Sequence, residues 1–197
     1  MAHVTAFESI TLDGVMQGLG RPDEDTRDGF AHGGWGDGFA DEVSMGFAAE
    51  GMAEEGAMLL GRRTYEDLLG YWTATPEPNP FTEHLLATTK HVVTRDPGAD
   101  AAYPGTTLHL GEAVETVAAL SAAHPDLELT IIGSGALVRS LHAVGLVDGY
   151  TLMIHPIVLG SGQRLFAPGD RTDLRLRRSV TTTTGVVIAD YAVEVRR

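Results

Sequence analysis

The chain has 197 residues, and its 27 acidic residues outnumber its 14 basic ones to give a formal net charge of −13 at pH 7. A nucleic-acid-binding surface needs a basic field, so this balance argues against nucleic acid as a partner. Cysteine is absent, which excludes a disulfide framework, thiolate metal ligands and a cysteine nucleophile.

The length fits one domain over residues 1–197, large enough to bury a core without disulfides or metal. No apolar stretch approaches the roughly 20 residues that span a bilayer, and the N-terminus lacks the regions of a signal peptide. These features predict a cytoplasmic protein with no membrane partner.

The first half of the chain predicts a strand, a long loop and then alternating helices and strands. Residues 18–38 are rich in glycine and charge, which predicts a mobile loop that serves as a lid or binding loop, with disorder that has no role as the alternative. The other elements expected here are a strand over 3–9, a turn over 11–14, a helix over 41–53, a strand over 57–60, a helix up to 70 and a proline-rich linker over 75–80.

The second half continues the alternation and closes with an antiparallel hairpin. The expected elements are strands over 91–94 and 107–110, a helix over 112–123, a strand over 129–132, a helix from 136, a strand over 150–159, and two strands over 174–181 and 186–195 that turn near 184–185. Strands that alternate with helices predict an α/β fold with a mostly parallel sheet covered on both faces.

One pattern typical of anion binding follows the apolar run 57–60. It consists of Gly61, Arg62, Arg63 and Thr64, which open the next helix. The free N–H groups of a helix start and two guanidinium groups favour a phosphate at this point. The alternative is that the arginines simply stay solvated at the start of a surface helix.

A second pattern of the same construction follows the apolar run 129–132. Gly133, Ser134 and Gly135 form a strand-to-helix turn in which glycine allows backbone amides to approach a pyrophosphate closely. Two such sites in one chain suggest a single dinucleotide ligand.

Six segments, taken in order, resemble the dihydrofolate reductase-like superfamily, and within it the branch that contains the reductase domain of bacterial riboflavin biosynthesis, the RibD C-terminal domain. The segments are 11–14, 60–66, 92–95, 132–137, 145–148 and 156–162. The resemblance covers nearly the whole chain and implies a three-layer sandwich around a mixed central sheet.

The resemblance also implies NADPH as the cofactor. Its 2′-phosphate would be held by residues at the ends of two neighbouring strands, namely Gly61, Arg62, Arg63 and Thr64 with Thr94 and Arg95 opposite them. Such a phosphate carries close to two negative charges, and bidentate arginines distinguish it from the bare hydroxyl of NADH.

The remaining cofactor residues are implied in the same way. The pyrophosphate would lie against Gly133, Ser134 and Gly135 and the helix that starts at Ala136 and Leu137, and the first strand and its turn, from Ala6 to Gly14, would flank the nicotinamide. Folate reductases have a paired glycine at the pyrophosphate turn, whereas this chain has Gly133 followed by Ser134.

Two aspartates are candidates for the catalytic acid. In folate reductases an acidic residue at the start of the helix after the long loop binds the pterin, and Asp41 has that place here, although its spacing from Trp35 differs by one. Asp41 also fits a helix-start carboxylate with no catalytic role. Asp13 is the other candidate, because it lies at the turn next to the expected cofactor, but an Asp before Gly also suits a turn.

Other chemistries have little support in the sequence. The eight histidines include no i, i+4 helical pair with an acidic third ligand, so no metal is predicted. Ser134 lacks the Gly-x-Ser-x-Gly spacing of a hydrolase nucleophile, and no Gly-x-Gly-x-x-Gly follows the first strand.

The function predicted is therefore an NADPH-dependent reductase that transfers hydride to a small heterocyclic substrate. The resemblance implies 5-amino-6-(5-phosphoribosylamino)uracil of riboflavin biosynthesis as that substrate, with a dihydrofolate or pterin substrate as the alternative. An alternative of another class is a non-catalytic nucleotide-binding module. Family members of this branch commonly form homodimers through their C-terminal strands, and the same is expected here.

Overall fold

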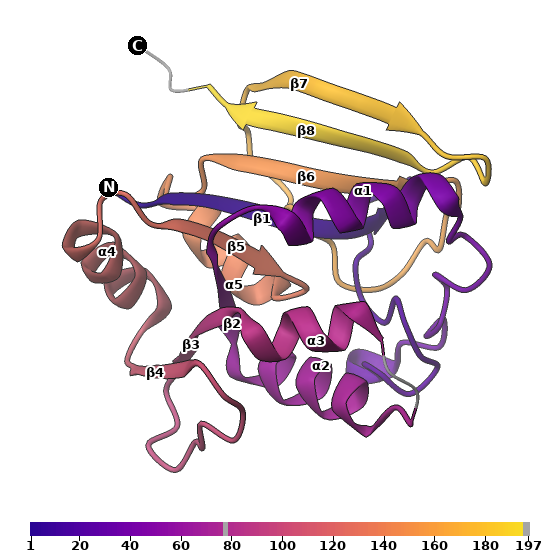
Figure 1. Ribbon diagram of the computed structural model, residues 1–197. Helices are drawn as coiled ribbons and strands as arrows, with labels where there is room; N and C mark the ends of the chain where they lie inside the picture. Colours follow the sequence, from indigo (N-terminus) through magenta and orange to yellow (C-terminus); the bar gives the residue numbers. More distant parts are fainter. Residues whose placement is uncertain (77–78, 195–197) are drawn as a thin grey trace. The chain divides into compact units, whose positions relative to one another are not determined.

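The computed structural model describes residues 1–76 and 79–194 (Figure 1). Its elements are, in chain order, β1 (His3–Thr11), the 3₁₀ turn η1 (Arg27–Gly29), α1 (Glu42–Ala53), β2 (Ala57–Gly61), α2 (Arg62–Ala74), α3 (Pro80–Ala87), β3 (Thr89–Thr94), β4 (Thr106–Leu110), α4 (Ala113–Ala123), β5 (Glu128–Ile132), α5 (Gly135–His142), β6 (Gly149–His155), β7 (Leu174–Thr181) and β8 (Val187–Val193).

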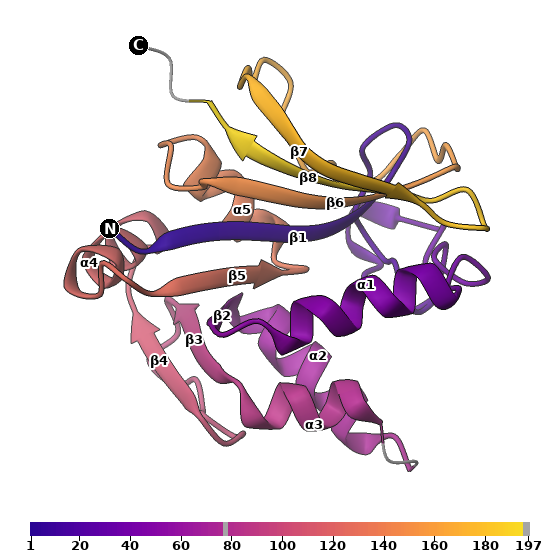
Figure 2. The same cartoon turned by 45° about the horizontal axis from the view of Figure 1, so that its top comes forward.

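The strands form a mixed sheet in the order β4-β3-β2-β5-β1-β6-β8-β7. β2 runs parallel to β3 and to β5, and β3 runs parallel to β4, which lies beside it in Figure 2. β8 pairs antiparallel with both β6 and β7. The predicted α/β fold, with a mostly parallel sheet and an antiparallel C-terminal hairpin, is confirmed.

The described chain divides into two compact units. The first consists of Met1–Thr5 and Met52–Val147, and the second of Ala6–Gly51 with the part from Asp148 onward. The chain passes between them within β1, within α1 and again just before β6. The expectation of one domain over residues 1–197 stays a prediction.

The core of the first unit forms around β2, whose residues from Ala57 to Leu60 are all buried. A continuous apolar run is typical of a strand that is covered on both faces. Tyr65 and Leu69, one helical turn apart on α2, pack on this core, and both are buried. The other buried members of the cluster are Met58, Leu60, Leu85 and Val92.

α3 is an element that the sequence interpretation missed, because a linker was expected over residues 75–80 and no element was predicted between that linker and the strand over 91–94. Glu77 and Pro78 of the expected linker lie outside the described residues. The Asn79 side chain caps α3 by accepting a hydrogen bond from Phe81 N at 2.8 Å. Proline at the first position of a helix costs no hydrogen bond, so Pro80 starts the helix rather than preventing it.

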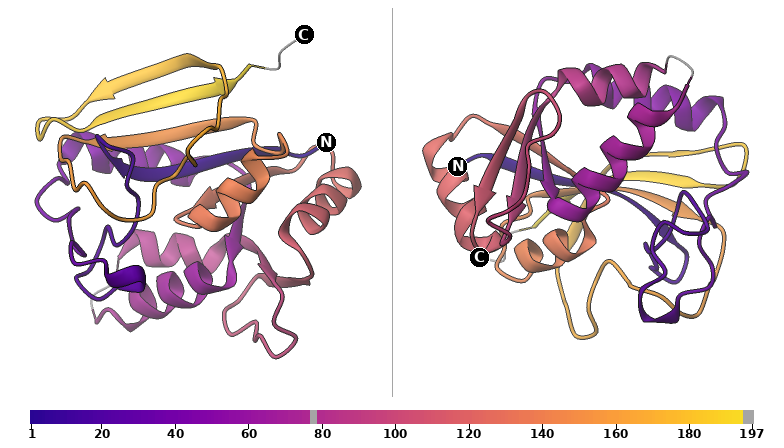
Figure 3. Two further views of the ribbon diagram at one scale, coloured as in Figure 1. Left: turned by 180° about the vertical axis from the view of Figure 1, so that it is seen from behind. Right: turned by 90° about the horizontal axis from the view of Figure 1, so that it is seen from below.

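α3 lies alongside α2, and the two helices are drawn in magenta in Figure 3. The Thr82 hydroxyl donates to the Trp72 carbonyl at 3.1 Å, and the Trp72 and Phe81 rings meet edge to face with their centroids 5.1 Å apart. These contacts fix the second helix of the pair against the first.

Lys90 on β3 is the single lysine of the chain, and it is fully buried. Its Nζ donates to the carbonyl oxygens of Leu85, at 2.6 Å, and Thr88. Both carbonyls lie at the C-terminal end of α3, where helix carbonyls lack partners and a cation is favourable. Burial lowers the pKa of Lys90. The side chain therefore serves as a buried C-terminal cap of α3.

In the second unit β6 is shorter than predicted. A strand over 150–159 was expected, but β6 ends at His155, and a tight turn follows in which Ile157 N donates to the His155 carbonyl at 2.8 Å. Pro156 has no N–H for a sheet hydrogen bond, which explains the early end. β8 begins at Val187 and ends at Val193, and the predicted end at Val195 lies outside the described residues.

None of the helices in residues 1–76 and 79–194 is long and apolar enough to cross a bilayer.

Partly or fully buried histidines in both units predict a pH-dependent stability. Burial lowers the pKa of His91, His109 and His155 from the usual 6.5. His91 Nδ1 and His109 Nε2 lie 2.9 Å apart on adjacent strands. Because the unfolded chain binds protons at a higher pH than the folded chain, stability is complete above about pH 6.5 and is lost below it, by up to about 1.4 kcal/mol per pH unit for each histidine.

Urea unfolding at a series of pH values between about 7.5 and 5.5 checks this expectation. The free energy of unfolding should fall with pH, and His109→Gln should reduce the slope. A midpoint that stays constant over this range would contradict it.

Candidate functional site

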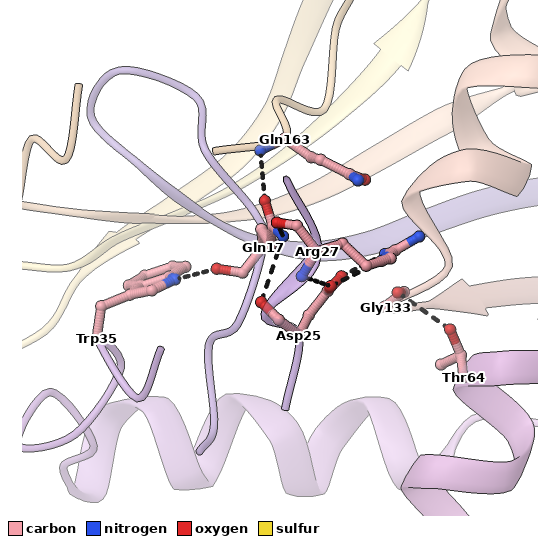
Figure 4. Close-up of polar contacts among 7 residues, drawn as sticks. All are labelled: Gln17, Asp25, Arg27, Trp35, Thr64, Gly133 and Gln163. Atoms are coloured by element: carbon pink, nitrogen blue, oxygen red, sulfur yellow. Dashed lines mark hydrogen bonds and ion pairs between the residues drawn. The ribbon is translucent and has the colours of Figure 1, made fainter. Parts of the chain in front are cut away.

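The structure brings the two predicted phosphate-binding turns together in the first unit. They follow β2 and β5, which are adjacent parallel strands, so both turns lie at the same edge of the sheet. Gly61 N donates to Ser134 Oγ at 3.0 Å. Thr64 Oγ1 donates to the Gly133 carbonyl at 3.3 Å, a contact drawn in Figure 4. Two hydrogen bonds thus tie one turn to the other.

Backbone geometry supports the role expected of these turns. Gly133 has a φ of +62°, a conformation that L side chains rarely adopt, and the described residues contain no cis peptide bond. Gly61 is the extended N-cap of α2, and no side chain caps that helix. The first N–H groups of α2 therefore remain available to an anion.

The two arginines of the first turn of α2 differ in their surroundings. Arg62 Nη1 donates to both carboxylate oxygens of Glu66, at 2.8 and 2.9 Å, and Arg62 Nε lies 4.0 Å from Asp96 Oδ2. Arg63 is exposed, and within residues 1–76 and 79–194 it has no ion-pair partner. Arg63 is thus the cation of this turn that can meet a phosphate without first giving up a carboxylate.

Thr94 and Arg95 end the neighbouring strand. The register pairs Gly61 with Val93, which places the end of β3 beside the start of α2. Thr94 is buried, and its hydroxyl accepts a hydrogen bond from Asp96 N at 3.0 Å. The Arg95 side chain is 78% exposed, and its ion pair is a loose one, with Nη1 at 3.8 Å from Glu112 Oε1. Arg95 therefore remains open to a ligand, whereas Thr94 mainly shapes the turn after β3.

The second turn continues into α5. Gly135 and Leu137 are buried, so the Leu137 side chain belongs to the core, while Ala136 is exposed. The Ser134 hydroxyl, which accepts from Gly61 N, also donates to the Ile132 carbonyl at 3.4 Å. Any pyrophosphate contact here would come from backbone N–H groups rather than from the Ser134 side chain.

Replacing Ser134 with alanine should lower the free energy of unfolding by about 1 kcal/mol, because Gly61 N loses its acceptor. Ser140→Ala on the same helix is the matched control; that exposed hydroxyl only donates to the Ala136 carbonyl within α5. The control should stay within about 0.5 kcal/mol of the wild type. Chemical denaturation of both variants measures the difference, and equal stabilities would contradict the bridging role.

Asp13 lies in the second unit, and its carboxylate is surrounded by donors. Oδ1 accepts from the Thr11 hydroxyl at 2.6 Å and from Leu159 N at 3.2 Å, and Oδ2 accepts from Gly160 N at 2.9 Å and lies 3.5 Å from Arg164 Nη2. Led by the Thr11 hydroxyl, these hydrogen bonds lower the pKa of Asp13 to about 2. Asp13 therefore holds the 156–164 loop against the end of β1 and carries no proton at neutral pH.

Asp41 lies at the start of α1 and caps it. Ser44 N donates to Asp41 Oδ1 and Asp41 N donates to Ser44 Oγ, both at 2.9 Å, in the reciprocal pattern of a capping box. Its Oδ2 accepts from both N and Oγ1 of Thr183 in the β7–β8 turn, at 2.6 Å each. These hydrogen bonds, that of the Thr183 hydroxyl first, hold the pKa of Asp41 well below its usual range.

The contacts of Asp41 match the alternative interpretation of a helix-start carboxylate. The catalytic role predicted for Asp13 and Asp41 stays a prediction, and the contacts that the structure shows for each of them are structural. Ala6 is fully buried on β1, on the same face as the buried Glu8. Gly14, with a φ of +80°, accepts from Leu165 N at 3.0 Å, and the nicotinamide role of Ala6 and Gly14 also stays a prediction.

Gln17 is a buried residue that the sequence interpretation did not single out. Its Nε2 donates to the carbonyls of Asp25 and Arg27, its Oε1 accepts from Gln163 N at 2.9 Å, and its own carbonyl accepts from Trp35 Nε1 at 2.7 Å (Figure 4). The segment 18–38, expected to be a mobile loop, is thus connected to a buried amide. Nothing in the sequence around Gln17 indicates that its side chain would be buried and would hold this segment.

Solved structures share this fold. A putative riboflavin biosynthesis protein from Shewanella sp. PV-4 matches with a TM-score of 0.67 and 19% identity, over 99% of this chain and 100% of that one. A pyrimidine reductase-like protein from Corynebacterium diphtheriae matches with a TM-score of 0.68 and 11% identity, over 99% and 93%. RibD of Acinetobacter baumannii gives a TM-score of 0.66 and 11% identity, and the match covers 99% of this chain but 59% of RibD.

Two sequence comparisons add to this. The uncharacterized protein YyaP of Bacillus subtilis (strain 168) is 35% identical over 69 residues, which make up 34% of this chain and 37% of YyaP. The match therefore spans well under half of that relative. The sequence profile of the RibD C-terminal domain matches residues 2–188, nearly the whole chain. Together with the dihydrofolate reductase-like fold, this match shows that the chain belongs to the RibD C-terminal domain family.

Proposed function

We propose that this chain is an NADPH-dependent reductase that transfers hydride to a small heterocyclic substrate. Membership of the RibD C-terminal domain family supports a reductase of the riboflavin-pathway type. The observation that carries the cofactor assignment is the pair of hydrogen bonds joining the turn at Gly61–Thr64 to the turn at Gly133–Ser134. It places two helix starts, one of them with two arginines, at one edge of the sheet.

The residues present fit NADPH chemically. A 2′-phosphate needs cationic donors, and Arg63 and Arg95 are exposed, while Arg62, next to Arg63 in sequence, is half-buried. A pyrophosphate needs backbone N–H groups that can be approached closely, and Gly133 adopts a left-handed conformation at the start of α5. Both requirements are met within the first unit.

In this proposal NADPH, when bound, supplies the hydride. Arg62, Arg63 and Arg95 hold the phosphate end and so select NADPH over NADH, since a guanidinium pair gains most from the doubly charged group. The backbone of the second turn orients the pyrophosphate, and Ser134 fixes that backbone through Gly61 N. Asp13 is ionised at neutral pH, so we do not propose it as the proton donor.

The test is NADPH oxidation by the pure protein with 5-amino-6-(5-phosphoribosylamino)uracil as the first substrate and dihydrofolate as the second. Steady oxidation with reduction of the ribosylamino group to a ribitylamino group supports the proposal. Turnover of dihydrofolate alone would make dihydrofolate the substrate in place of the pyrimidine. Tight NADPH binding without turnover of either compound would favour a non-catalytic nucleotide-binding module.

We further propose that the protein works in the cytoplasm as a homodimer joined through the C-terminal strands. Leu176 on the edge strand β7 is 50% exposed, and in the register it pairs with Tyr191 of β8. An exposed apolar side chain on an edge strand suits burial against a second copy. Light scattering after gel filtration tests this, and a monomer at micromolar concentration would contradict it.

A further inference from the structure

Glu66 neutralises one of the cations on which the proposed cofactor depends. The Arg62 guanidinium donates through a single nitrogen, Nη1, to both oxygens of Glu66, and the pair lies one helical turn apart on α2. Asp96 lies 4.0 Å from the Nε of the same guanidinium. Arg62 is thus held by carboxylates on two sides in the free protein.

A phosphate that approaches Arg62 meets this arrangement. The incoming group is a dianion, and the Glu66 carboxylate that already engages the guanidinium repels it. Both side chains are partly exposed, Arg62 at 39% and Glu66 at 49%, so their ion pair is weak enough to be broken by a ligand. Arg63, next in sequence, has no such competitor among the described residues.

We propose that Glu66 is a positioning residue that controls recognition of the 2′-phosphate by withholding Arg62 from it. The inference deepens the proposed function and rests on its cofactor assignment. When a phosphomonoester binds, Arg62 exchanges the Glu66 carboxylate for the phosphate, and Glu66 returns to solvent. The carboxylate therefore reduces the affinity for ligands with a 2′-phosphate and leaves ligands without one nearly unaffected.

The test measures binding of two adenosine nucleotides by calorimetry, so that neither the nicotinamide nor turnover enters the result. Adenosine 2′,5′-bisphosphate carries the 2′-phosphate, and adenosine 5′-monophosphate lacks it. Glu66→Gln should tighten binding of the bisphosphate about three- to tenfold and change binding of the monophosphate less than about twofold. A merely structural role of Glu66 would move both ligands together.

Two further variants test whether Glu66 acts on bisphosphate binding through Arg62. Glu115→Gln on α4 makes the same change in net charge at an exposed glutamate that has no ion pair with an arginine in the described part of the chain, and it should leave both affinities unchanged. In an Arg62→Ala background, adding Glu66→Gln should change bisphosphate binding less than about twofold, because the cation it releases is missing.

The outcomes separate this inference from the proposed function. A wild-type protein that prefers the bisphosphate, together with a Glu66→Gln variant of unchanged preference, overturns the inference alone. The inference alone is also overturned if Glu66→Gln still tightens bisphosphate binding in the Arg62→Ala background, since the effect would then come from the change in overall charge and not from Arg62. A wild-type protein that binds both nucleotides equally overturns the inference and the 2′-phosphate assignment together. NADPH oxidation tests the reductase activity independently.

Discussion

Arg63→Ala should weaken NADPH binding about tenfold to a hundredfold and leave NADH binding almost unchanged, because the loss of a charge-assisted contact costs about 1.5 to 3 kcal/mol. Arg63 is exposed and has no ion-pair partner in the described part of the chain, so its whole charge is available to the 2′-phosphate. A fluorescence titration with each nucleotide measures the two affinities. The variant should lose most of the preference for NADPH over NADH, which is the ratio of the two affinities.

Two other arginine variants calibrate this result. Arg62→Ala should have the smaller effect, since Glu66 already engages that guanidinium. Arg177 on β7 lies in the second unit, is exposed, and has no ion-pair partner among the described residues. Arg177→Ala should therefore change neither affinity. If Arg63→Ala binds NADPH as well as the wild type does, the 2′-phosphate is held elsewhere and the assignment is wrong.

Gly162→Ala should reduce the free energy of unfolding by about 2 to 4 kcal/mol. Gly162 has a φ of +115°, and a Cβ added there would lie 2.7 Å from both Phe30 and Val15. Those two side chains form a buried cluster with Trp35, so they have little room to move. The variant therefore combines backbone strain with overpacking of the core of the second unit.

Gly160→Ala is the control for the backbone contribution. It has a φ of +75°, but a Cβ added there would meet nothing within 4 Å. Its cost should be about 1 kcal/mol, that of the left-handed conformation alone. Urea unfolding of both variants gives the two values. Equal costs would mean that the cluster around Phe30 yields easily, contrary to its close packing.

Strands and helices with a clear periodicity were predictable from the sequence. The apolar run at β2 and the β-branched run at β5 are typical of buried strands. β2 ends at Gly61, the N-cap of α2, and β5 is followed by Gly133, two residues before α5 begins. α3 was missed because prolines were taken as signs of a linker, although Asn79 before Pro80 is a regular helix start. The end of β6 was overestimated because hydrophobicity continues through Ile157, beyond the point where Pro156 ends the pairing.

The site was predictable to the extent that local sequence determines it. The two turns predicted to bind phosphate follow from strand, glycine and helix start, and the structure shows them joined by hydrogen bonds. The bond between Gly61 and Ser134 spans 73 residues, and no local pattern reports such a contact. The same limit applies to Asp41, whose partner Thr183 lies 142 residues away. A carboxylate in a sequence shows its charge, but only the fold shows which donors already occupy it.

The burial of Lys90 has a consequence for the chemical modification of this protein. Reagents that acylate primary amines react with exposed lysine side chains, and the single lysine here is enclosed, with its ammonium group bonded to two carbonyls at the end of α3. The native fold thus offers no lysine to such reagents, and acylation at Lys90 reports that the segment around α3 has opened. One residue becomes a built-in reporter of local unfolding, readable by mass spectrometry without any substitution.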